Sequence, residues 1–120
     1  MAGPIDIKAE AAALGAKLRA TNEFAEVYDF PPAITLVQSA TILPTGGEPE
    51  TWDETALRFD VILVASTGDY PQALDWLSSA ISTVNETLGI TGWGETYLTT
   101  ANGSDVLAVR VTLTRILTGG

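Results

Sequence analysis

A strand followed directly by one long amphipathic helix, over residues 56–89, constrains the fold of this chain more than any other feature. Within residues 57–65 every odd position is apolar, which is the period of two of a strand with one buried face. The even positions begin polar and then become apolar, so the second half of the strand is expected to be covered on both sides, in the middle of a sheet. The odd positions are Leu57, Phe59, Val61, Leu63 and Ala65.

The helix of this pair is expected to follow a polar turn at residues 66–71 and to end at Gly89. Ser66, Thr67 and Asp69 can each cap its first turn, where Pro71 is well tolerated. Glycine is a common residue at the end of a helix. Large apolar residues follow at spacings of three and four, so they share one face that is expected to pack on the sheet: Leu74, Leu77, Ile81, Val84 and Leu88.

A second helix is predicted over residues 5–21, where alanine is abundant. Its buried stripe is expected to comprise Ile7, Ala11, Leu14 and Leu18, which recur at helical spacing. Gly15 within this helix costs about 1 kcal/mol relative to alanine, unless its small size allows close packing.

The other strands are expected at residues 33–41, 95–100 and 106–117, with a short extended piece at 24–30. An Asn-Gly pair within residues 101–105 predicts a hairpin between the last two strands. Residues 90–94 are expected to be a connector. The order of elements predicts one α+β domain over residues 1–120, with a mainly antiparallel sheet of four to five strands and two helices packed on one face.

A long exposed loop is expected between two antiparallel strands, at residues 44–55, because this segment is rich in glycine, proline and acidic residues. Loops of this length are often functional. Trp52 lies in its centre, beside Glu50, Asp53 and Glu54. A lone tryptophan in a polar loop is either tucked back onto the fold or exposed as a contact residue for another chain.

Composition argues against an enzyme and predicts neither catalytic residues nor a bound metal or cofactor. The chain contains no histidine and no cysteine, so the usual general base and nucleophile pairs and a thiolate metal site are excluded. The net charge of −9 opposes direct binding to DNA, although it allows DNA to slide past an acidic wall. No apolar run is long enough to span a membrane, and we expect no membrane association.

Asp60 is unusual because it is a charged residue inside the central strand. We expect it to form a cross-strand ion pair with Arg110 or Arg115 of the last strand, on the less covered face of the sheet. The alternative is an ion pair with a neighbouring subunit.

An Ala/Leu-rich helix at residues 9–20 is followed by three segments, EVYDFPPAITLV at residues 26–37, FDVILVASTGDYPQALDWLSSAI at 59–81 and VLAVRVTLTRIL at 106–117. In this order they resemble the small tail terminator proteins, which join tail to head in the neck of long-tailed bacteriophages. The resemblance covers most of the chain as a pattern of elements rather than as identical residues. Head–tail connector or stopper proteins of the neck have a similar size and remain an alternative.

The resemblance implies a structural virion protein that assembles in the host cytoplasm as a homohexameric ring. The ring would cap the tail tube, end polymerisation of the major tail tube protein and face the head–tail connector proteins, while DNA passes through its lumen. A small-molecule-binding α+β domain is the alternative from another class. The residues expected at the subunit or tube interface are Glu50, Trp52, Asp53, Glu54, Trp93 and Tyr97.

Overall fold

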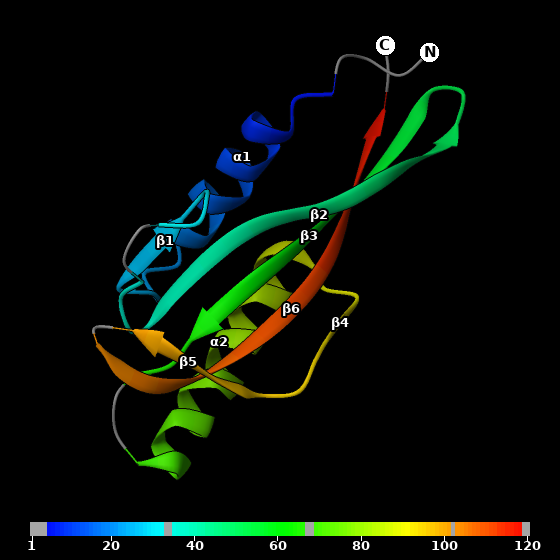
Figure 1. The fold of residues 1–120 in the computed structure, drawn as a ribbon. Helices are drawn as coiled ribbons and strands as arrows, with labels where there is room; N and C mark the ends of the chain where they lie inside the picture. The colour runs from blue at the N-terminus through cyan, green and yellow to red at the C-terminus, as the bar shows by residue number, and fades with distance from the viewer. Residues whose placement is uncertain (1–4, 33–34, 67–68, 102, 119–120) are drawn as a thin grey trace.

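The computed structural model describes residues 5–32, 35–66, 69–101 and 103–118. Within them the chain forms two helices and six strands, in the mixed order predicted for an α+β domain (Figure 1). The elements are α1 (Ile7–Arg19), β1 (Glu26–Tyr28), β2 (Ser39–Thr51), β3 (Glu54–Val64), α2 (Tyr70–Leu88), β4 (Gly92–Trp93), β5 (Tyr97–Ala101) and β6 (Ser104–Thr118).

The strands form one sheet in the order β1-β2-β3-β6-β4, and β5 pairs with the beginning of β6. β1 runs parallel to β2, whereas the other pairings are antiparallel. β3 lies between β2 and β6, which confirms the central position predicted for this strand. The sheet has six strands rather than four or five, because residues 90–94 include the two-residue strand β4 and are not merely a connector.

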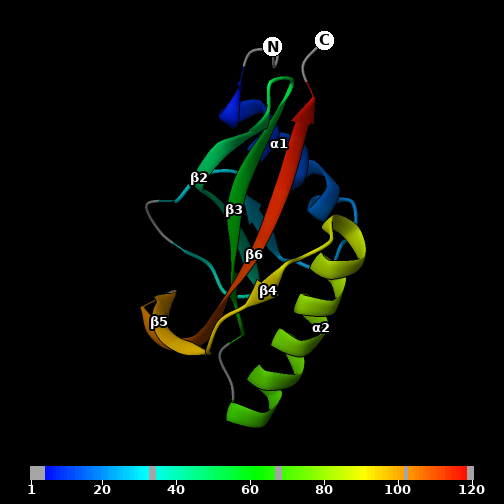
Figure 2. The same ribbon diagram turned by 90° about the vertical axis from the view of Figure 1, so that its right-hand side faces the viewer.

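Both helices pack on the same face of the sheet, as predicted (Figures 1 and 2). The odd residues of β3 form the floor of this core, and Phe59, Val61 and Leu63 are completely buried. Leu77 and Val84 of α2 are buried against them, while Leu74, Ile81 and Leu88 of the predicted stripe are partly buried. The buried stripe of α1 contains the expected Ala11, Leu14 and Leu18.

The other expected member of that stripe, Ile7, is not in the core. It is the first residue of α1, and 44% of its surface is exposed. The periodicity was correct, but the stripe extends one turn beyond the part of the helix that the sheet covers. Ile7 is therefore an apolar residue on the surface.

The helix ends follow the predicted chemistry. The Asp69 side chain accepts a hydrogen bond of 2.9 Å from the backbone N–H of Gln72, and so caps α2. Thr67, another predicted cap, lies outside the described residues. Gly89 ends this helix with a φ of +71°, a conformation that glycine adopts without strain.

The opposite face of the sheet contains the predicted ion pair of Asp60. Arg110 Nη1 lies 3.2 Å from Asp60 Oδ2, and the Asp60 side chain is only 7% exposed. The guanidinium group therefore compensates a nearly buried carboxylate. The other predicted partner, Arg115, instead lies 3.7 Å from Glu10 of α1.

The strand predicted at residues 33–41 begins later than expected. β2 starts at Ser39, because Gln38 adopts a left-handed conformation with a φ of +53° that interrupts an extended chain. Residues 33–34 of this prediction lie outside the described residues. The predicted hairpin between the last two strands is present, since Ala101 pairs with Ser104, although its Asn102 also lies outside the described residues.

The prediction of a long loop at residues 44–55 is wrong. β2 and β3 continue through this segment, and Thr51 pairs with Glu54, so only Trp52 and Asp53 form the turn. Pro44 and Pro49 are compatible with a strand here because no described strand pairs with the outer edge of β2 beyond Thr41. Proline is tolerated on such an edge, where its missing N–H removes no ladder bond.

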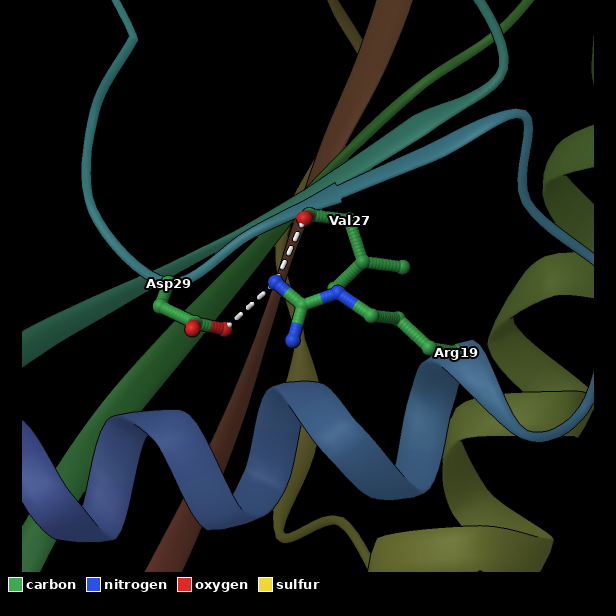
Figure 3. Close-up of polar contacts among 3 residues, drawn as sticks. All are labelled: Arg19, Val27 and Asp29. Carbon is green, nitrogen blue, oxygen red and sulfur yellow. Dashed lines mark hydrogen bonds and ion pairs between the residues drawn. The ribbon is translucent and has the colours of Figure 1, made fainter.

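A polar clamp attaches the end of α1 to β1 and to the residue that follows it (Figure 3). One nitrogen of Arg19, Nη2, donates hydrogen bonds of 2.8 Å to the Val27 carbonyl oxygen and 2.9 Å to Asp29 Oδ1. Gly15 lies one turn earlier on α1, and a Cβ atom at this position would collide with Asp29 Oδ1. Gly15 therefore provides close packing, which was one of the two roles predicted for it.

Replacing Leu77 by alanine should lower the free energy of unfolding by about 2–5 kcal/mol, since it removes a side chain that is 2% exposed. Urea denaturation followed by circular dichroism measures this change. A loss below about 1 kcal/mol would contradict the packing of α2 described above.

Replacing Gly15 by alanine should destabilise the protein by about 1–3 kcal/mol, because the clash with Asp29 outweighs the better helix propensity of alanine. In an Asp29→Ala background the same substitution should become stabilising, by up to about 1 kcal/mol. Urea denaturation of the four proteins tests this change of sign. An equal effect in both backgrounds would show that Asp29 is not the obstructing group.

Candidate functional site

The principal candidate site is an arm formed by residues 44–58 of β2 and β3 together with residues 114–118 at the end of β6. β3 is its middle strand, paired to β2 on one side and to β6 on the other. In Figure 1 the arm extends past the helices to one end of the molecule. The whole chain measures 50 × 25 × 24 Å, so the arm contributes to a markedly elongated shape.

The tip of the arm carries an exposed aromatic ring and three neighbouring carboxylate residues. Trp52 is 79% exposed, which excludes the alternative that it is tucked back onto the fold. Glu50 is exposed, whereas Asp53 and Glu54 are half-buried. The Thr51 hydroxyl lies 2.7 Å from Asp53 Oδ1 and 3.4 Å from Glu54 Oε1, so these two carboxylates are held beside the turn.

Two open hollows meet at Ile7 and Pro44, which line both of them. The first extends along the arm as far as Pro49 and Thr55, and the second lies at the base of the arm. The first has a volume of about 480 Å³ and includes Pro49 and Leu57 on its walls. The second has a volume of about 700 Å³ and is bounded by Phe30. Their shared wall makes one continuous, largely apolar surface, which we call the basal groove.

The backbone around the basal groove is held in place by an ion pair and by close packing between two strands. The clamp between Arg19 and Asp29 fixes the chain that leads directly to Phe30, which is 71% exposed. Gly47 belongs to β2 at the groove, and a Cβ atom there would lie 2.7 Å from the Ala56 carbonyl oxygen. A larger residue at this position would push β2 away from β3, so the close strand contact requires glycine.

Charged side chains of both signs line the basal groove. Arg58 lines the first hollow together with Glu48, and Lys8 lines the second together with Asp29, which is paired with Arg19. Arg58 Nη1 is 3.1 Å from Glu48 Oε1, but both side chains are about half-exposed. Exposed pairs of this kind contribute about 0–1 kcal/mol, so Arg58 can exchange its partner at little cost. Lys8 has no carboxylate partner within the part of the chain that the structure describes.

Trp93 and Tyr97 lie apart from the arm, on strands that pair with the beginning and middle of β6. Trp93 is opposite Val111 and is 62% exposed, while Tyr97 is opposite Ala108 and is 37% exposed. The six residues predicted for the interface therefore do not share one surface. Four lie at the tip of the arm, Trp93 is on the face of Val111, which packs against the helices, and Tyr97 is on the opposite face with Ala108.

Sequence reasoning did not identify the basal groove. Ile7 was assigned to the core, and Phe30 was treated only as the end of an extended piece before two prolines. An aromatic residue directly before a proline pair is a signal that could have been used, since it cannot continue into a helix or a central strand. The proximity of Phe30, Ile7 and Pro44 depends on tertiary structure.

The described residues contain no group of three or more metal-binding side chains. Neither described helix is long and apolar enough to cross a membrane. A scan of the sequence against models of known protein families gives no match, and a search of curated proteins finds no relative. The arm, the basal groove and the exposed side chains of Trp93 and Tyr97 are therefore the features on which a functional assignment depends.

Proposed function

We propose that this chain is a structural subunit of a long-tailed bacteriophage, a tail terminator that assembles into a homohexameric ring on the end of the tail tube. The ring ends polymerisation of the major tail tube protein and forms the surface that meets the head–tail connector. DNA passes through its lumen without specific binding. The subunit assembles in the host cytoplasm and is located in the neck of the virion.

The observation that carries this proposal is the arm with its exposed tryptophan. An aromatic side chain that is 79% exposed at the end of an ordered hairpin costs hydration free energy in a free monomer, and such residues are enriched at the centres of protein interfaces. A second exposed surface, around Trp93, lies elsewhere on the sheet. A ring subunit requires separate surfaces for its neighbours and for the tube, so this distribution supports an assembly role.

The charge of the chain also supports this role. The sequence has 15 acidic and 6 basic residues, and each described arginine side chain lies within 4.0 Å of a carboxylate. The remaining surface charge is therefore mostly negative, and it repels the phosphates of DNA. This property suits a channel through which DNA must move without being retained.

A head–tail connector or stopper of the same neck is the second candidate function, since it also needs exposed contact surfaces on a small α+β subunit. It would bind the head-side ring in place of the tail tube. A small-molecule-binding domain is less well supported, because the hollows at the arm are open and their convergent polar groups are few.

Replacing Trp52 by alanine should abolish capping of tail tubes while the free energy of unfolding changes by no more than about 0.5 kcal/mol, because the side chain is exposed. Electron microscopy of purified tubes mixed with each protein counts the capped ends. Tyr70→Ala is the matched control, since Tyr70 is an aromatic residue that is 59% exposed at the start of α2, at the other end of the molecule from the arm (Figure 1).

The wild type and Tyr70→Ala should cap one end of each tube, with rings of six subunits seen end-on. Tubes left bare by the wild-type protein would contradict the terminator assignment. Decoration of isolated connector rings in the same experiment would instead support the stopper. Equal capping by Trp52→Ala would show that the arm tip is not part of the contact.

A further inference from the structure

We infer that the tip of the arm of one copy docks into the basal groove of a second copy, in a head-to-tail contact. The inference deepens the proposed function and rests on it for the claim that successive contacts close into a ring. The contact itself is argued from two surfaces of this chain, which are complementary in shape, polarity and charge.

Polarity is the first element of this match. The tip presents Trp52, a large apolar ring with one polar N–H group, and the basal groove presents an apolar floor that includes Ile7, Pro44 and Leu57. The hollows of the groove measure about 480 and 700 Å³. Sites of roughly 300–1,000 Å³ hold drug-sized molecules, so an indole ring fits within either one.

Charge is the second element. Glu50, Asp53 and Glu54 lie within two residues of Trp52 in the chain, while Arg58 and Lys8 line the groove. The groove also contains Glu48 and Asp29, but Arg58 pairs with Glu48 and Arg19 pairs with Asp29, so Lys8 is the lining cation without a described carboxylate partner. A docked tip would place its acidic groups against Arg58 and Lys8. Arg58 need only exchange Glu48, its exposed partner at 3.1 Å, for a carboxylate of the neighbouring copy. The chain as a whole carries a net charge of −9, which opposes the approach of an acidic tip in general.

Trp52 does not line the groove of its own chain, so we assign the groove to the tip of a second copy. β2 and β3 remain paired up to Thr51 and Glu54, directly beside the turn that carries Trp52. Folding the tip back would break this ladder. The tip and groove are different surfaces of one chain, so the contact is heterologous and leaves a free tip and a free groove at the two ends of every open assembly. Such a contact generates a ring when its rotation closes.

Cross-linking of single cysteines tests the contact, since the chain has no native cysteine. Asp53→Cys labels the tip and keeps Trp52, and Ile7→Cys labels the groove. Leu98→Cys is the control, because Leu98 is an exposed apolar residue of β5 that belongs to neither surface. Each tip variant is mixed with one partner variant carrying a size tag, and a short bismaleimide is added.

A cross-linked heterodimer of Asp53→Cys with Ile7→Cys, but not with Leu98→Cys, is the expected result. Adding Trp52→Ala to the Asp53→Cys chain should reduce its yield about tenfold or more, because a central aromatic anchor is lost. Equal cross-linking to Ile7→Cys and Leu98→Cys, or cross-links formed only between two Asp53→Cys tips, would overturn the inference.

Complementation gives a second test that does not depend on cross-linking. Ile7→Glu should fold normally, since an acidic residue at the first turn of a helix is favourable, but its charge should exclude the acidic tip. We expect Ile7→Glu and Trp52→Ala to remain monomeric alone in sedimentation velocity and to form 1:1 dimers when mixed, because one intact tip meets one intact groove. Failure of the mixture to dimerise under conditions where the wild type associates would overturn the contact.

The two proposals fail in different ways. If the wild type caps tubes but Asp53→Cys never cross-links to Ile7→Cys on those caps, the tip-in-groove contact is wrong and the terminator function stands. If the cross-link forms and the wild type never binds a tube, the contact stands and the function is wrong.

Discussion

The pairing of β3 with β6 is the interaction on which the rest of the structure depends. All 11 residues of β3 pair with β6, from Glu54 opposite Thr118 to Val64 opposite Ala108. This register places Phe59, Val61 and Leu63 beside Val109, Val111 and Leu113 under both helices. Burial of each such side chain contributes roughly 1.5–3 kcal/mol, and a slip of one residue would move all of them to the opposite face.

The same pairing also creates the arm. β3 and β6 are longer than the helices can cover, so their outer ends continue as paired strands with exposed β2 at one edge. The middle strand is buried there by its neighbours, and Ala56 and Leu57 are 2% and 4% exposed. The core and the candidate contact surface are therefore parts of one continuous sheet, which gives the tip a defined position relative to the basal groove.

Periodicity predicted the elements that form the core, because the apolar residues of β3 and α2 follow the spacing of a strand and of a helix. The arm was missed because Pro44, Gly46, Gly47 and Pro49 are typical of a loop. On the edge strand β2 the prolines break no ladder bond, and the register shift beside Gly46 accommodates the chain as a bulge. The basal groove could not be predicted, since Ile7, Phe30 and Pro44 meet only in the folded chain.

Amide hydrogen exchange in the isolated protein tests the existence of the arm most directly, and the proposed contact depends on the arm. If the arm is a paired extension of the sheet, the amides of Thr55, Ala56 and Leu57 in its middle strand should exchange slowly, since β3 is bonded on both sides. In β2, which is bonded to no described strand other than β3 in this segment, slowly exchanging amides should alternate with fast-exchanging ones. Uniformly fast exchange over residues 44–58 would mean that the segment is the loop first expected, and would contradict both the arm and the contact proposed for its tip.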